Sequence, residues 1–192
     1  MGSGIGIGLL GLGTVGGGVA SILQSPSERH PLVADLKLVR VAVRDLNRPR
    51  SVELPIKILT TDPAVVVNDP AVDVVVEVIG GIEPARSLIL QAIAAGKSVV
   101  TANKAVIARH GEEIADAATK AGVYVLIEAA VGGGIPIIEP LKQSLGGNRI
   151  NRVSGIINGT TNYILTRMAE EGAAYESVLK DAQELGYAEA DP

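Results

Sequence analysis

The stretch Gly6-Ile-Gly-Leu-Leu-Gly-Leu-Gly-Thr-Val-Gly16 decides how the rest of the chain is interpreted. Its first half belongs to an apolar run, residues 5–10, which is typical of a buried parallel strand. Its second half has the spacing G-x-G-x-x-G, and residues 14–23 predict a helix. In such a turn the first glycine permits the bend, the second lets a pyrophosphate approach the backbone, and the third lets the helix pack on the strand. Because strand, turn and helix occur together, a dinucleotide site is favoured over an ordinary glycine turn.

The composition of the 192 residues narrows the class of protein. Hydrophobic residues make up 47% and aromatic residues only 2%, so the core is aliphatic, as in parallel α/β sheets. A net charge of -4 gives no reason to expect nucleic acid or an acidic membrane as a partner. There is no apolar run of about 18 residues and no basic-then-apolar leader, so we expect no membrane and a cytoplasmic location. The absence of cysteine excludes disulfides, thiolate metal sites and cysteine nucleophiles.

Apolar runs alternate with helix-like stretches, which is typical of βαβ units. We therefore expect an α/β fold with a Rossmann-type doubly wound parallel sheet in residues 1–130, an NAD(P)-binding domain. Residues 131–192 are expected to begin a second α/β domain for substrate binding and dimerisation. Further expected elements are strands at 37–43, 71–79, 97–101, 123–127 and 149–157, and helices at 83–95, 112–121, 136–145, 162–170 and 175–185, with Thr160 and Thr161 as candidate caps.

The end of the strand at 37–43 bears on which dinucleotide binds. In NAD-binding folds an acidic residue about 20 residues beyond the glycine turn holds the ribose hydroxyls. Here Arg44 comes first and Asp45 follows it. An arginine at this place can hold a 2′-phosphate through two N–H donors, which favours NADP. The alternative is that Arg44 is a solvated loop charge and Asp45 binds the ribose.

Two more segments follow predicted strands, and ligands bind at the carboxyl ends of strands in these folds. Lys104 ends the segment Thr101-Ala-Asn-Lys104; it is either a cation for a phosphate, a carboxylate or a developing alkoxide, or an exposed loop lysine. Glu128 begins the segment Glu128-Ala-Ala-Val-Gly-Gly-Gly-Ile-Pro-Ile-Ile138. A carboxylate beside exposed carbonyls suits an alkali or alkaline-earth ion, and a turn between domains without an ion explains the same residues equally well.

Together these segments resemble homoserine dehydrogenase, in the family's order and over the whole chain. The glycine turn is common to many dehydrogenases, whereas the motifs around Asn158 and Gly186 are far more specific. The matching motifs are Gly11-Leu-Gly-Thr-Val-Gly16, Val43-Arg-Asp45, Val99-Val-Thr-Ala-Asn-Lys104, Glu128-Ala-Ala-Val-Gly-Gly-Gly-Ile-Pro-Ile-Ile138, Gly155-Ile-Ile-Asn-Gly-Thr-Thr-Asn-Tyr163 and Glu184-Leu-Gly-Tyr-Ala-Glu-Ala-Asp-Pro192.

The resemblance implies NADP- or NAD-dependent interconversion of L-homoserine and L-aspartate 4-semialdehyde, on the route to threonine and methionine, by a homodimer. Hydride passes between the nicotinamide and the aldehyde carbon, while a lysine handles the proton on oxygen. Glu189 would hold the substrate's amino group, and Lys104 would lie near nicotinamide and substrate. Glu128, with the carbonyls of Val131, Gly133 and Ile135, matches a sodium site. The residues implied for the cofactor are Leu12, Gly13, Thr14, Val15, Arg44, Lys57, Lys104 and Gly186.

One departure from the family limits the expected activity. The family continues beyond Asp191-Pro192 into a segment carrying an aspartate and the lysine usually given the proton-transfer role. The chain therefore resembles the first part of the enzyme, and we expect it to bind NADP(H) without appreciable dehydrogenase activity of its own. The alternative is a nucleotide-binding module with no catalysis. Aspartate semialdehyde dehydrogenase works through a cysteine thioester, so the absence of cysteine argues against it.

Overall fold

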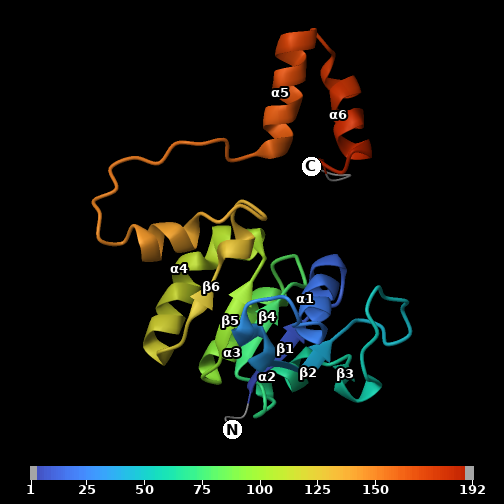
Figure 1. Ribbon diagram of the computed structural model, residues 1–192, viewed down its shortest axis with the longest axis vertical. Helices are drawn as coiled ribbons and strands as arrows, with labels where there is room; N and C mark the ends of the chain where they lie inside the picture. The colour runs from blue at the N-terminus through green and yellow to red at the C-terminus, as the bar shows by residue number, and fades with distance from the viewer. Residues whose placement is uncertain (1–3, 189–192) are drawn as a thin grey trace. The chain divides into compact units, whose positions relative to one another are not determined.

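A computed structural model describes residues 4–188, and the chain divides into two compact units between Glu139 and Pro140. The first unit contains six parallel strands in the order β3-β2-β1-β4-β5-β6, which run from right to left across Figure 1. This is the strand order of dinucleotide-binding folds, so the predicted Rossmann-type sheet is confirmed. The strands are β1 (Ile5–Leu10), β2 (Leu36–Ala42), β3 (Leu59–Thr60), β4 (Val74–Glu77), β5 (Ser98–Thr101) and β6 (Val125–Leu126).

The sheet is covered on both faces, which is why its strands are apolar on both sides. Consecutive residues of a strand point to opposite faces, and Leu9 and Leu10 of β1 are both fully buried. Leu9 packs in a cluster with Ala20 of α1 (Thr14–Gln24). Leu10 packs in a second cluster whose other members come mainly from the opposite layer of helices, α2 (Pro63–Asn68), α3 (Ala85–Ala94) and α4 (Lys104–Ala121).

Helix α4 begins at Lys104 and not at the predicted Glu112. Asn103 caps it, because its side-chain oxygen accepts a hydrogen bond from the Val106 N–H at 3.2 Å. Val106 itself is buried against the sheet. At the other end Gly122 adopts a left-handed conformation with φ of 68° and ends the helix.

In the described residues 140–188 of the second unit, the regular elements are all helical and irregular chain joins them. A π-helical turn, Pro140–Ser144, precedes α5 (Gly159–Glu171) and α6 (Tyr175–Glu184), and these two helices lie side by side. Ile164 of α5 packs on Val178 and Ala182 of α6. Arg167 links the helices through a 2.7 Å hydrogen bond to Asp181.

Three predictions in this unit are wrong. The predicted strand at 149–157 is irregular chain, with Val153 exposed, and the predicted helix at 136–145 is reduced to the short π-helical turn. A strand is stable only beside another strand that satisfies its backbone groups, and residues 140–188 contain none. The cap of α5 is Asn158, whose side chain accepts from Thr161 N–H at 2.9 Å, instead of Thr160 or Thr161.

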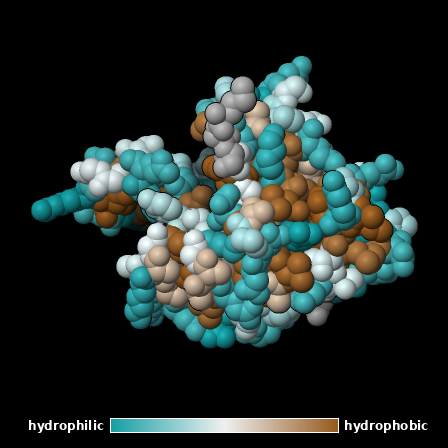
Figure 2. Space-filling view, turned by 90° about the horizontal axis from the view of Figure 1, so that it is seen from below, coloured by the Kyte–Doolittle hydropathy of each residue, from teal (hydrophilic) through white to brown (hydrophobic). Residues whose placement is uncertain are grey.

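None of the helices within residues 4–188 is long and apolar enough to cross a membrane. The surface is not uniformly polar: Figure 2 shows a face on which apolar patches are bordered by hydrophilic residues. Large hydrophobic side chains are exposed in both units, among them Val15, Ile56, Ile135, Ile157 and Leu165.

Candidate functional site

The candidate site lies at the edge of the sheet where the parallel strands end. The order of the strands reverses between β1 and β4, and ligands of such sheets bind outside the strand ends at that point. Backbone hydrogen bonds continue beyond the strands and hold the loops together there. Gly11 N–H donates to the Ala42 carbonyl at 3.0 Å, and Val78 N–H donates to the Leu10 carbonyl at 2.9 Å.

The three glycines of the G-x-G-x-x-G turn have three different environments. Gly11 has a φ of 104°, a left-handed conformation that other residues rarely adopt. A Cβ atom placed on Gly16 would lie 2.1 Å from the Gly11 carbonyl oxygen, so helix and turn are in direct backbone contact. A Cβ atom on Gly13 would meet no atom within 4 Å, so this position faces open space. The geometry therefore matches the predicted bend at Gly11 and the predicted close packing at Gly16, and it leaves space at Gly13, where the approach of a ligand stays a prediction.

Helix α1 begins beside Gly13 with backbone N–H groups that no acceptor within residues 4–188 satisfies. Gly13 is the N-cap, and its carbonyl accepts the hydrogen bond of Gly17 N–H at 2.7 Å. Within the described residues no side chain caps this helix, and its first turn holds no acidic residue. The first N–H groups of a helix have no intrahelical partner and carry a partial positive charge. Thr14 and Val15 are exposed at this end, whereas Leu12 is half-buried against the α1 side of the core.

Arg44 follows β2 at the same edge and is exposed. Within residues 4–188 its side chain forms no hydrogen bond or ion pair. The Asp45 carboxylate, in contrast, accepts a hydrogen bond from Asn47 N–H at 2.8 Å. Arg50, which the sequence did not single out, donates to the carbonyls of Asp45 and Arg48 and so holds this loop in shape. The loop leaves Arg44 available to an anion.

Lys57 is not brought together with Arg44. It lies in the short 3-10 turn Ile56–Ile58 before β3, and its carbonyl accepts from the Arg40 guanidinium at 3.1 Å. It lines a hollow with Leu36 and Leu38, which belong to the first half of β2, whereas Arg44 follows the end of that strand. Its role towards a cofactor stays a prediction.

Lys104 is exposed at the first position of α4, directly after the end of β5. Beneath it lies a buried polar network that the sequence analysis missed. Glu77, the last residue of β4, has no exposed surface, and its carboxylate accepts from Thr101 Oγ1 at 2.6 Å and from Ile79 N–H at 2.8 Å. Asn103 donates through Nδ2 to the Gly81 carbonyl at 2.7 Å. The sequence contains one signal for this network, which is a glutamate within the apolar run of residues 71–79.

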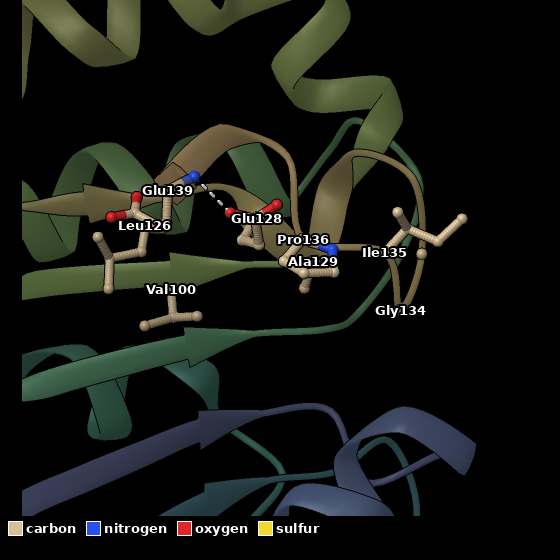
Figure 3. Close-up of a pocket in the computed structure, with 9 residues that line it drawn as sticks. Val100, Leu126, Glu128, Ala129, Gly134, Ile135, Pro136 and Glu139 are labelled. Atoms are coloured by element: carbon tan, nitrogen blue, oxygen red, sulfur yellow. Dashed lines mark hydrogen bonds between the residues drawn. The ribbon is translucent and has the colours of Figure 1, made fainter. Parts of the chain in front are cut away.

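The Glu128 side chain is hydrogen-bonded to the backbone of its own loop. Its carboxylate accepts from the N–H groups of Ile137 at 2.6 Å, Ile138 at 3.0 Å and Glu139 at 2.6 Å, and Figure 3 shows the last of these bonds. These bonds hold residues 137–139 against Glu128. The first compact unit therefore extends to Glu139, whereas the sequence predicted a division after Ala130. Glu128 and Glu139 border a hollow between the 128–139 loop and strands β5 and β6. The other residues that line it are Val100, Leu126, Ala129, Gly133, Gly134, Ile135 and Pro136.

The chemistry of the loop can be compared with the predicted sodium site. Among the backbone hydrogen bonds of residues 4–188, none ends on the carbonyls of Val131, Gly133 or Ile135. These hard oxygen atoms suit an alkali ion, although an ion would share the Glu128 carboxylate with three N–H donors. The described residues hold no group of three or more His, Cys, Asp or Glu side chains suited to a metal.

The remaining predicted residues belong to the end of the chain. Gly186 follows α6 with a φ of 75°, and its N–H donates to the Gln183 carbonyl at 3.0 Å. It lies in the second unit, and its approach to a cofactor stays a prediction. Glu189 lies outside the described residues.

Two family models match the chain. The model described as homoserine dehydrogenase, NAD binding domain, matches residues 11–128, and the model described as homoserine dehydrogenase matches residues 136–192. The chain belongs to the homoserine dehydrogenase family. Within this family it is 65% identical over 186 residues to homoserine dehydrogenase of Synechocystis sp. and 47% identical over 188 residues to that of Bacillus subtilis. Each alignment covers 97% of this chain and 43% of the relative, so the chain spans less than half the length of these relatives.

Solved structures of the family have the same fold. A homoserine dehydrogenase from Thiobacillus denitrificans aligns with a TM-score of 0.83 at 52% identity, over 98% of this chain and 44% of that chain. A hyperthermophilic archaeal homoserine dehydrogenase, solved in complex with NADPH, aligns with a TM-score of 0.80 at 27% identity, over 98% of this chain and 63% of that chain.

Proposed function

We propose that this chain is the nucleotide-binding part of a homoserine dehydrogenase that interconverts L-homoserine and L-aspartate 4-semialdehyde with NADP, in threonine and methionine synthesis. The observation that carries the proposal is the glycine turn at the switch point of the sheet. It combines a left-handed Gly11, an open Gly13 and a Gly16 in backbone contact. Membership of the family supplies the substrate pair. A homodimer and a cytoplasmic location of the whole protein belong to the same proposal.

The proposed cofactor contacts follow from the strand ends. The N–H groups at the start of α1 and the open Gly13 receive the pyrophosphate, with Leu12, Thr14 and Val15 beside it. Arg44 receives the 2′-phosphate, since the Asp45 carboxylate already accepts from Asn47. This assignment favours NADP over NAD. The NADPH in the archaeal relative's structure is consistent with it.

When bound, the nicotinamide supplies or accepts the hydride. Lys104 is proposed to hold the substrate oxygen on which negative charge develops during the transfer. Its position directly after β5 supports this role, because the loops at strand ends form the ligand site in these folds.

A sodium ion in the 128–139 loop is a finer part of the proposal. The carbonyls of Val131, Gly133 and Ile135 and the Glu128 carboxylate supply the hard oxygen atoms that such an ion requires. Its role would be structural, because Glu128 already fixes residues 137–139 by hydrogen bonds. We assign it no step in the hydride transfer.

The proposal is tested by calorimetric titration of the 192-residue chain with NADPH and with NADH. We expect NADPH to bind, and Arg44→Asp to weaken it by at least about tenfold while changing NADH little, since a charged hydrogen bond contributes about 1.5–3 kcal/mol. Lys57→Asp makes the same change of charge at the other basic residue predicted for this phosphate, so it tests the rival assignment. Equal weakening of both nucleotides by Arg44→Asp would refute the assignment, and weakening of NADPH by Lys57→Asp alone would transfer it to Lys57.

An assay with homoserine and NADP separates the enzyme from the binding module. We expect the chain to bind nucleotide without appreciable turnover. Turnover comparable with that of a whole homoserine dehydrogenase would contradict the expectation that the chain is inactive alone.

A further inference from the structure

The proposed function leaves one buried polar cluster without a role. Glu77 and Thr101 are the last residues of β4 and β5, and they are directly paired in the register of the sheet. Both are fully buried, and Thr101 Oγ1 donates to the Glu77 carboxylate at 2.6 Å. The same hydroxyl oxygen accepts from Asn103 N–H at 3.0 Å. A buried carboxylate costs free energy unless it is well hydrogen-bonded, so its place in an apolar strand calls for a reason.

The cluster joins the two loops that follow these strands. On one side the Glu77 carboxylate accepts from Ile79 N–H at 2.8 Å, which fixes the start of the loop 78–82. On the other side Asn103 donates to the Gly81 carbonyl of that loop at 2.7 Å and also caps α4 through its side-chain oxygen. Lys104 is the next residue. Every hydrogen bond of the cluster therefore tends to keep the two loops, and the base of Lys104, in one arrangement.

The two loops face the half of the site that Arg44 does not reach. In doubly wound folds each half of the sheet binds one mononucleotide, and β4 to β6 form the second half. Arg44 follows β2 in the first half, where the adenosine phosphate is proposed to bind. Gly80 and Gly81 both have positive φ, and a Cβ atom on Gly80 would meet nothing within 4 Å. The loop after β4 is thus open to a ligand.

We propose that Glu77, Thr101 and Asn103 act as positioning residues that hold the loops 78–82 and 102–104 as one wall for the nicotinamide half of the cofactor. This inference rests on the proposed function. It makes a prediction that a general structural role does not make: breaking the cluster weakens the whole dinucleotide but not its adenosine half.

The test titrates the 192-residue chain with NADPH and with adenosine 2′,5′-bisphosphate, which lacks the nicotinamide half. Thr101→Val keeps the shape of the side chain but removes the hydroxyl, so Glu77 loses a donor and Asn103 N–H loses its acceptor. We expect NADPH to bind about three- to tenfold more weakly and the bisphosphate to bind within about twofold of wild type. Thr101→Ser keeps the hydroxyl and is expected to restore NADPH binding. Equal weakening of both probes, or of neither, would overturn the inference.

Asn103→Ser gives an independent variant that does not remove the helix cap. Serine can cap α4, but it cannot donate to the Gly81 carbonyl as the amide does. Like Thr101→Val, Asn103→Ser is expected to weaken the binding of NADPH but not that of the bisphosphate. Unchanged NADPH binding would count against the inference.

Amide hydrogen exchange separates failure of this inference from failure of the proposed function. If the wild-type chain binds neither probe, nucleotide binding by this chain is refuted. Exchange in the chain without nucleotide still decides whether the cluster couples the loops. Faster exchange at both Ile79 and Val106 in Thr101→Val supports the coupling, and faster exchange at one or neither overturns it.

Discussion

The second and third roles in the glycine turn, ligand approach and close packing, can be separated by exchanging Gly13 and Gly16 for alanine. A Cβ atom at position 16 would lie 2.1 Å from the Gly11 oxygen and 2.9 Å from its carbonyl carbon, and contacts under 3.0 Å essentially never occur. Both neighbours are backbone atoms, so α1 must move away from the turn by roughly 1 Å. Overpacking of this kind costs about 1–3 kcal/mol, and we expect the upper end because no flexible side chain can yield.

Gly18→Ala is the control for helix propensity. It is exposed in the same helix, and its Cβ atom would meet nothing within 4 Å. Alanine should therefore stabilise the protein by about 0.5–1 kcal/mol. Allowing the same gain at position 16, we expect Gly16→Ala to be destabilised by about 2 kcal/mol relative to wild type and by about 3 kcal/mol relative to Gly18→Ala. Urea unfolding followed by circular dichroism measures the differences.

Gly13→Ala should behave in the opposite way. Its φ of -84° is open to alanine and its surroundings are empty, so the free energy of unfolding should stay within about 0.5 kcal/mol of wild type. The methyl group would instead occupy the space through which a pyrophosphate approaches the backbone, and NADPH should bind at least about tenfold more weakly. The reasoning is refuted if Gly16→Ala is as stable as Gly18→Ala, or if Gly13→Ala binds NADPH like wild type.

Two further predictions concern the ion site and the pH dependence of stability. If the 128–139 loop holds sodium, the chain should unfold at a higher temperature in NaCl than in KCl of equal ionic strength, and Glu128→Gln should abolish that difference; equal melting in both salts for wild type rejects the ion. Hydrogen bonds to the Asp69 carboxylate, first from the Ala71 N–H and second from the Arg40 guanidinium, lower the pKa of Asp69 below its usual 3.8. Its contribution to stability is therefore complete above that value and is lost as the pH falls through the lowered pKa. Asp69→Asn should cost about 1–2 kcal/mol at pH 6, since the Asp69 side chain is only 11% exposed, and the cost measured by urea unfolding should shrink below about pH 4; a cost independent of pH would contradict the assignment.

The sequence predicted the sheet because its signals are local. Apolar runs such as residues 71–79 can be stable only between two covered faces, and the glycine turn adds a bend whose steric demands only glycine meets. Helix α4 begins before the predicted residue 112, at Lys104, and so includes Gly111, a residue of low helix propensity. The structure tolerates that glycine inside the helix because Val106, Ile114 and Ala118 lie along the buried face of α4 and pack on the core.

The predicted strand at 149–157 failed for a different physical reason. Its apolar residues, among them Ile150 and Ile156, have the composition of a strand, but backbone pairing is supplied by a neighbour and not by the segment itself. The network of Glu77, Thr101 and Asn103 could not be predicted from the sequence either. Its partners Glu77 and Thr101 are 24 residues apart, and only the register of β4 against β5 brings them together.

The buried polar side chains of this sheet lie at the two ends of its strands, and the two ends differ in what they face. Before β5, Lys97 donates to the carbonyls of Asp69 at 2.7 Å and Val72 at 2.5 Å, which satisfies backbone groups and closes that edge. At the carboxyl edge, Glu77 and Asn103 instead fix loops that contain Gly80 and adjoin Lys104, and these remain open. The polar group at the closed edge completes hydrogen bonds of the backbone. Those at the open edge hold the loops that we propose as the wall of the nucleotide site, so substitutions there should separate nucleotide binding from folding.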